Sequence, residues 1–173
     1  MPAPRLTRTG PFFEQPPMVP HPMNIAELIK PETILLDLNV STQNRLFEEI
    51  ARKLEQQYGL NRDLIVKSLA AREKLGSTAL GLGMALPHAR VKGLSDAKAV
   101  YVRTELALPF DAPDGKPVSH VLALLVPERA TEAHLQLLAG VAQLFSDQDF
   151  RQQLRHCATP QAVHTLFQEW PQA

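Results

Sequence analysis

The residues whose types and spacing could do chemistry lie together between positions 72 and 90. This segment reads REKLGSTALGLGMALPHAR, in which an arginine, two hydroxyls and three glycines lead into a short apolar run that ends at Pro87-His88. Proline fixes its own backbone and drives the residue before it toward an extended conformation. We therefore expect Met84 to His88 to form a short strand or extended exit that holds the imidazole of His88 in a defined place.

An imidazole held in this way could act as a nucleophile toward a group with oxyanion character. The unperturbed ring titrates near neutrality, so a useful neutral fraction is available. The guanidinium groups of Arg72 and Arg90 could bind phosphate oxygens in a fork, and the hydroxyls of Ser77 and Thr78 could donate further hydrogen bonds. Such positioning and charge stabilisation is what phosphoryl transfer requires of a protein.

Each of these residues also has an ordinary structural interpretation. A histidine that follows a proline is, considered alone, more often structural than catalytic. Ser77 and Thr78 could simply brace the loop. Arg72 could be a solvated cation, which is favourable near the end of a helix, and Arg90 could be an ordinary surface residue. His120 falls in a buried apolar strand, where we expect a hydrogen-bonded core histidine.

Two familiar nucleotide-binding motifs are excluded. Gly76 and Gly81 have the spacing of a P-loop, but Leu82 and Gly83 stand where lysine and serine or threonine are needed. Gly81-Leu82-Gly83 lacks the third glycine of a dinucleotide-binding loop. No metal-ligand spacing such as HExxH occurs. We therefore expect neither a cofactor nor a metal, and the phosphoryl donor should be another protein.

The segment at 72–90 resembles the active-site segment of the fructose/mannitol-type (type 2) IIA domains of the bacterial phosphotransferase system, whose usual form is REKxGSTGIGNGIAIPHG. Three further segments match in the same order: PFDAPDGKPV at 109–118, ALLVPE at 123–128 and HLQLLAGVAQLFSD at 134–147. The opening and closing segments, ELIKPETILLDLNVSTQNRLFE and HTLFQEW, are similar to the nitrogen-regulatory branch. The resemblance runs from about Asn24 to Trp170.

The resemblance implies the roles of three residues. His88 would be the phosphorylated histidine, with the group on Nε2. His134 would be the second active-site histidine, in the first turn of a helix whose N-terminus also favours anions. Arg72 would neutralise the transferring group. Leu82 stands where asparagine is common, and Ala89 stands where a glycine usually follows the histidine.

The resemblance also implies the partners. An HPr-like phosphocarrier protein would be the donor, and the apolar residues Leu82 and Met84 are candidates for contact with it, although a core position is the more ordinary fate of each. In the nitrogen-regulatory branch, phosphorylation controls binding to downstream regulatory proteins linked to nitrogen and potassium. One alternative is a sugar-specific IIA component that passes phosphate to a IIB domain. Another is an interaction module that is no longer phosphorylated.

Length and composition agree with one globular domain. The chain has 173 residues, a formal net charge of zero and a single cysteine, Cys157. We expect no nucleic-acid partner and no internal disulfide. No apolar stretch approaches ~18 residues, so we expect no membrane span and a cytoplasmic location. Residues 1–22 hold seven of the fifteen prolines, which predicts a disordered extension before a domain at 23–173. Alternatively, Phe12 and Phe13 could strap the extension across the surface.

The periodic patterns predict an α/β fold with a single mixed β-sheet and helices packed on both faces. Strands are expected at 33–38, 97–104 and 118–126. A short helix should follow Asn24, and longer helices should be capped by Ser41, Asn61 and Thr131. The helix after Thr131 should bury Leu135, Leu138, Ala142 and Phe145. Two more helices are expected at 147–156 and 161–170.

Overall fold

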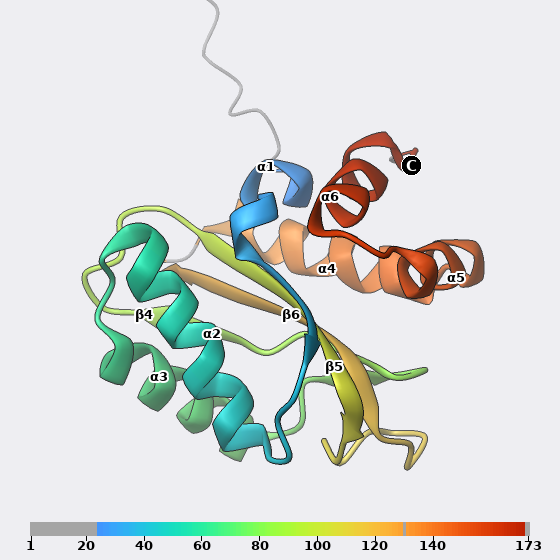
Figure 1. Cartoon of the computed structure of the whole chain (residues 1–173). Coiled ribbons are helices and arrows are strands. Elements are labelled where there is room, and N and C mark those ends of the chain that lie inside the picture. The colour runs from blue at the N-terminus through green and yellow to red at the C-terminus, as the bar shows by residue number, and fades with distance from the viewer. Residues whose placement is uncertain (1–23, 130, 172–173) are drawn as a thin grey trace, which may run out of the picture.

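The structure, a computed structural model, describes residues 24–129 and 131–171 (Figure 1). The predicted extension at 1–22 lies outside the described residues. The centre of the fold is one mixed sheet in the order β1-β5-β6-β3-β2, with β4 pairing with β6 beyond β3. The strands are β1 (Ile34–Leu38), β2 (Ala79–Gly81), β3 (Met84–Ala85), β4 (His88–Val91), β5 (Lys98–Leu108) and β6 (Val118–Pro127).

Helices cover both faces of this sheet, as predicted (Figure 1). The helices are α1 (Ile25–Leu28), α2 (Gln43–Tyr58), α3 (Arg62–Leu75), α4 (Glu132–Ser146), α5 (Gln148–His156) and α6 (Pro160–Glu169), and a 3-10 turn at Pro31–Thr33 precedes β1. One face packs against α2 and α3, and we call it the α2–α3 face. The other packs against α1, α4, α5 and α6, and we call it the α4 face. Within the described residues, no helix is long and apolar enough to cross a membrane.

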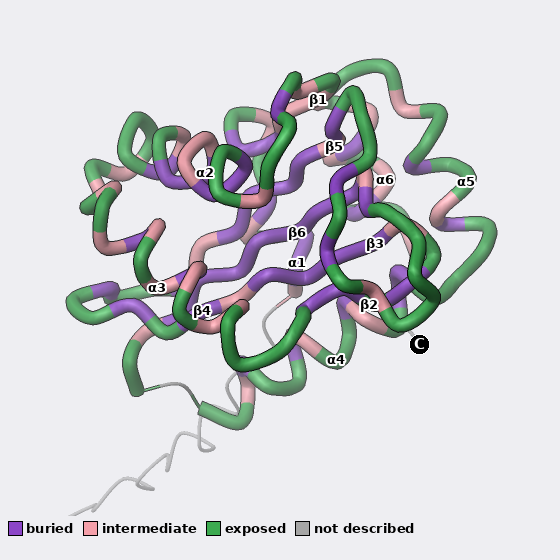
Figure 2. The backbone as a smooth tube through the Cα atoms, turned by 90° about the horizontal axis from the view of Figure 1, so that it is seen from below, coloured by how far each residue is buried: buried purple, intermediate pink, exposed green. Residues whose placement is uncertain are grey.

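Strand β6 explains why the sheet is buried on both sides. Its apolar residues alternate between the two faces: Val121, Ala123 and Leu125 pack toward α2 and α3, whereas Leu122, Leu124 and Val126 pack toward α4. A strand covered by helices on both faces needs such a continuous apolar run. Figure 2 shows β5, β6 and β3 as buried strands at the centre of the molecule.

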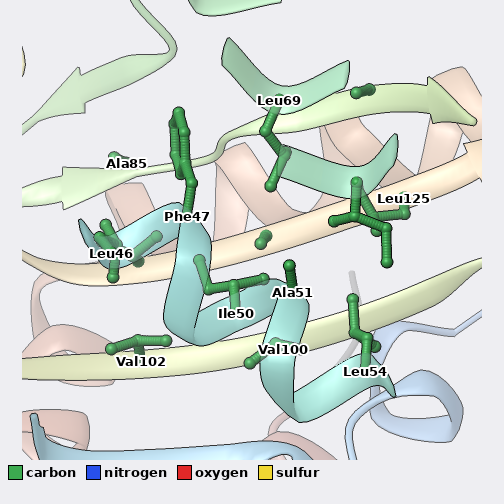
Figure 3. Packing of buried hydrophobic residues seen from close by; sticks show 14 of the residues in the cluster. Leu46, Phe47, Ile50, Ala51, Leu54, Leu69, Ala85, Val100, Val102 and Leu125 are labelled. Atoms are coloured by element: carbon green, nitrogen blue, oxygen red, sulfur yellow. The ribbon is translucent and has the colours of Figure 1, made fainter. Parts of the chain in front are cut away.

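The α2–α3 face holds a tightly packed core (Figure 3). Phe47, Ile50 and Leu54 recur at helical spacing along α2 and are at most 2% exposed. Ile50 and Leu54 lie over β5, which carries Val100 and Val102, and Phe47 extends toward Ala85 of β3.

The helix ends follow local capping chemistry with one difference. The predicted cap at Ser41 is wrong by one residue, because α2 is capped by Thr42, whose hydroxyl accepts the N–H of Arg45 at 3.1 Å. Adjacent hydroxyls suit this role equally, and backbone geometry selects one. Helix α2 ends at Gly59 with a left-handed φ of 66°. Asn61 caps α3 as predicted.

The predicted inner face of α4 is partly wrong. Leu135 is 61% exposed, and the helix instead buries His134, Leu137, Val141, Leu144 and Phe145. The stretch from His134 to Ser146 carries no Asp, Glu, Lys or Arg. Because both faces are uncharged and largely apolar, the pattern along the chain does not determine which face turns inward.

Candidate functional site

His88 opens strand β4 at the edge of the sheet. His88 pairs with Leu124 of β6, and the N–H of Leu124 donates to the carbonyl of Pro87 at 2.9 Å. Ala89 and Val91 pack into the α2–α3 face. Because successive strand residues point to opposite faces, His88 and Arg90 point toward the α4 face. The imidazole is half-buried there.

A backbone carbonyl determines the tautomer of His88. The ring nitrogen Nδ1 lies 2.8 Å from the carbonyl oxygen of Leu86. A carbonyl can only accept, so Nδ1 carries the proton and donates it. In the neutral ring the lone pair is then on Nε2. The local extended backbone around Pro87 produces this contact, since it places the carbonyl two residues before the ring.

His134 lies on the same face of the sheet, in the first turn of α4. It is 9% exposed, and its Nδ1 accepts the N–H of Thr131 at 2.9 Å. This bond belongs to a reciprocal capping box, in which His134 occupies the position usually held by glutamate or glutamine. Because Nδ1 accepts, the proton of the neutral ring is on Nε2. The two histidines therefore have complementary tautomers, one with a lone pair on Nε2 and one with a donor there.

The two arginines are placed differently. Arg72 lies in the last turn of α3, which packs beside β4 from the α2–α3 face. Its guanidinium donates to the carbonyl of Gly76 at 2.9 Å, and within the described residues no hydrogen bond joins it to His88 or His134. Arg90 is exposed and points to the same face as His88.

The hydroxyls of Ser77 and Thr78 form hydrogen bonds within the protein. The hydroxyl of Ser77 donates to the carbonyl of Phe110 and accepts the N–H of Ala79. Thr78 is 6% exposed, and both its hydroxyl and its N–H donate to the carboxylate of Glu73, at 2.7 and 3.0 Å. These contacts agree with the interpretation that Ser77 and Thr78 brace the loop.

Two carboxylates that shape this region, Glu73 and Asp114, give only weak signals in the sequence. Glu73 binds Thr78, and Asp114 accepts the N–H of Leu82 at 2.9 Å. Glu73 simply follows Arg72 in a charged helix end, and Asp114 simply precedes a glycine in a turn. Of the two apolar candidates for donor contact, Leu82 is 54% exposed and Met84 is 1% exposed.

His120 is a core residue, as predicted. It is 5% exposed, and its Nδ1 lies 2.8 Å from the hydroxyl of Tyr101. Burial, with smaller contributions from Arg103 and Arg155, lowers the pKa of His120 to about 4. This ring therefore stays neutral in the folded protein under ordinary conditions.

We expect His120 to make stability depend on pH. The unfolded ring takes up a proton below about pH 6.5, whereas the folded ring does so only near pH 4, so the unfolded state gains protons as pH falls. The free energy of unfolding should fall by about 2 kcal/mol between pH 7 and pH 5 from this group alone. Urea titrations at pH 7 and pH 5 should show this additional fall in the free energy of unfolding for the wild type and not for His120→Asn. Parallel profiles would contradict the assignment.

No cluster of three or more His, Cys, Asp or Glu side chains suited to a metal ion is present in residues 24–129 and 131–171. His134 lies instead in the first turn of α4, and the N-terminus of a helix favours an anion. His88 therefore offers one nitrogen lone pair on the face of the sheet where His134 offers a donor.

Comparisons with known proteins identify the family. The family model described as "Phosphoenolpyruvate-dependent sugar phosphotransferase system, EIIA 2" matches residues 27–170. A nitrogen regulatory protein of Bradyrhizobium diazoefficiens is 37% identical over 144 residues, covering 83% of this chain and 94% of that protein. A nitrogen regulatory protein of Pseudomonas aeruginosa is 34% identical over 145 residues, with 83% and 94% covered.

A solved structure agrees with these relatives. The crystal structure of nitrogen regulatory protein IIA-Ntr from Neisseria meningitidis superposes with a TM-score of 0.79 at 42% identity, covering 83% of this chain and 98% of that one. The same α/β architecture is therefore present in a relative of known structure. The chain belongs to the EIIA type 2 family of the phosphoenolpyruvate-dependent sugar phosphotransferase system, with nitrogen regulatory proteins among its relatives.

Proposed function

We propose that the chain is a phosphohistidine carrier that accepts a phosphoryl group on His88 from an HPr-like protein and acts as a phosphorylation-dependent regulator linked to nitrogen and potassium. The observation that supports this most is the hydrogen bond from Nδ1 of His88 to the carbonyl of Leu86. It leaves the lone pair on Nε2, and His134 on the same face has a donor on its own Nε2. A cytoplasmic location, as expected from the sequence, is part of this proposal.

Transfer of the phosphoryl group to His88 requires no proton to be gained or lost by the protein. The Nε2 lone pair of His88 attacks phosphorus and forms a new N–P bond, while the donor's own N–P bond breaks and its nitrogen keeps the electron pair. The proton on Nδ1 stays in its bond to Leu86. Charge on the phosphoryl oxygens would be stabilised by Nε2–H of His134 and by Arg72. Because α3 lies on the opposite face of the sheet, this requires Arg72 to leave Gly76 and to extend past the edge strand β4 toward His88.

The hydroxyls have a smaller part in this proposal than the sequence pattern predicted. We expect Thr78→Val to lower the free energy of unfolding by about 1–2 kcal/mol, because Glu73 loses the hydrogen bond from the hydroxyl and keeps only the one from the backbone N–H. The rate of phosphoryl acceptance should change by less than about threefold. Thr78→Ser, which keeps the hydroxyl, is the matched control. A loss of rate near 100-fold without loss of stability would instead assign the Thr78 hydroxyl to phosphate binding.

One experiment tests the carrier function and separates it from its alternatives. The full chain is incubated with phosphorylated HPr-like carrier, and the modified residue is located by mass spectrometry at neutral to alkaline pH. Label on His88 supports the proposal, and no label would favour the non-phosphorylated interaction module. Phosphoryl transfer onward to a IIB domain would favour a sugar-specific component, whereas phosphorylation-dependent binding of regulatory proteins without such transfer supports the regulator.

A further inference from the structure

The turn between β2 and β3 holds a leucine in an unfavourable state. Leu82 has a left-handed backbone with a φ of 59°, and it stands between Gly81 and Gly83, whose φ values are 86° and 77°. Residues with a Cβ avoid this region, and asparagine tolerates it better than leucine. The side chain of Leu82 is also 54% exposed. The backbone of Leu82 is therefore strained, and its exposed side chain buries little apolar surface.

Contacts from a distant loop impose this conformation. Asp114, between β5 and β6, accepts the N–H of Leu82 at 2.9 Å and the N–H of Lys116 at 3.0 Å. These two bonds hold the pKa of Asp114 below its ordinary value. The carbonyl of Gly83 accepts the N–H groups of Ser119 and His120 at 3.1 Å each. The turn is thus held from both sides.

The turn belongs to the surface around the acceptor histidine. Ala79 packs into the α2–α3 face, so Leu80 points to the α4 face, as His88 does. Leu80 is 39% exposed, and the stretch from Leu75 to Pro87 carries no charged residue. Leu82 precedes His88 by six residues, which places it within about 20 Å. A protein docked on His88 covers a patch about 30 Å across, so a patch that extends from His88 toward β2 and β3 includes this turn.

We propose that Asp114 holds Leu82 in its left-handed conformation so that Leu80 and Leu82 form an apolar contact for the phosphoryl-donor protein. The inference rests on the proposed function of His88. The partner surface would be apolar and uncharged, beside the donor's own phosphohistidine. The donor is preferred over a second copy of this chain because the turn shares a face with the residue that the donor must approach.

The test uses a substitution that should stabilise the fold and at the same time weaken binding of the donor. Leu82→Asn should raise Tm by about 2–4 °C, because asparagine accepts the left-handed backbone. It should also raise the KM for phosphorylated donor roughly tenfold, with kcat unchanged, because an apolar contact is lost. Leu82→Met, which keeps an apolar side chain, should retain the wild-type KM. A stabilised Leu82→Asn variant with wild-type KM would overturn the inference.

Asp114 should act through Leu82 rather than by itself. Asp114→Ala should raise the KM for donor with kcat unchanged, and Asp114→Asn should restore part of the loss, since its amide oxygen can still accept one N–H. Combining Asp114→Ala with Leu82→Asn should raise KM no further than Leu82→Asn does. Additive effects of the two changes on KM would exclude this positioning role.

The outcomes separate the inference from the proposed function. If the wild type takes up no phosphoryl group, the carrier function fails and the inference fails with it. If the wild type is phosphorylated on His88 but the KM values of the Leu82 variants match it, only the inference fails. Gel filtration of the same variants completes the test, since a change in self-association with unchanged KM would assign the turn to a second copy and overturn the donor contact.

Discussion

Replacing His88 by alanine should abolish phosphoryl uptake, with a fall in rate of at least about 10⁴-fold. The reason is chemical, because the bond from Nδ1 to the carbonyl of Leu86 leaves the nucleophilic lone pair on Nε2 of His88, and alanine has no such nitrogen. The ring is half-buried at the edge of the sheet, so its removal should leave the fold intact. Phosphotransfer from labelled HPr-like carrier, with circular dichroism as a check on folding, measures the effect.

The control for this change is His156→Ala, since His156 is an exposed histidine at the end of α5. It should accept phosphate at the wild-type rate. The same proposal specifies the nitrogen: phosphorus–nitrogen coupling in an NMR spectrum of the phosphorylated protein should assign the group to Nε2. Uptake by His88→Ala, or a group on Nδ1, would refute the arrangement proposed for the ring.

Removal of His134 should slow transfer by about 100-fold in kcat, as expected when one donor to a developing anion is lost. The structure adds a complication, because His134 also accepts the N–H of Thr131 in the capping box of α4. His134→Ala should therefore also lower the free energy of unfolding by about 1 kcal/mol. Rapid-quench kinetics and urea unfolding measure the two effects separately.

Glutamine separates the two roles of His134. At this helix position a glutamine can accept the N–H of Thr131, so His134→Gln should recover the stability of α4. Its amide cannot also reproduce the position of Nε2–H, so the rate should stay low. If His134→Gln restored both stability and rate, or if His134→Ala reacted as fast as the wild type, this histidine would be a helix cap and nothing more.

Local patterns along the chain were sufficient to predict much of the fold. The buried strand at 118–126 and the burial of His120 within it follow from the apolar run, and the cap at Asn61 is a side-chain bond within three residues. The extended backbone before His88 follows from Pro87 in the same way. Such short-range interactions are present in the sequence itself, so these predictions agree with the structure.

Interactions between distant segments decided the remainder. The rotation of α4, which exposes Leu135 and buries His134, has no local signal because the helix carries no charged residue after Glu132. The bond from Asp114 to Leu82 joins residues 32 positions apart, and the bond from Ser77 to Phe110 joins residues 33 apart. The sequence by itself determined which residues are the candidates for the chemistry, whereas the tertiary structure decided which hydroxyls are already engaged and which leucine faces outward. The physical reason is that a backbone or side-chain donor has several possible acceptors along the chain, and only the packed sheet brings one of them within reach.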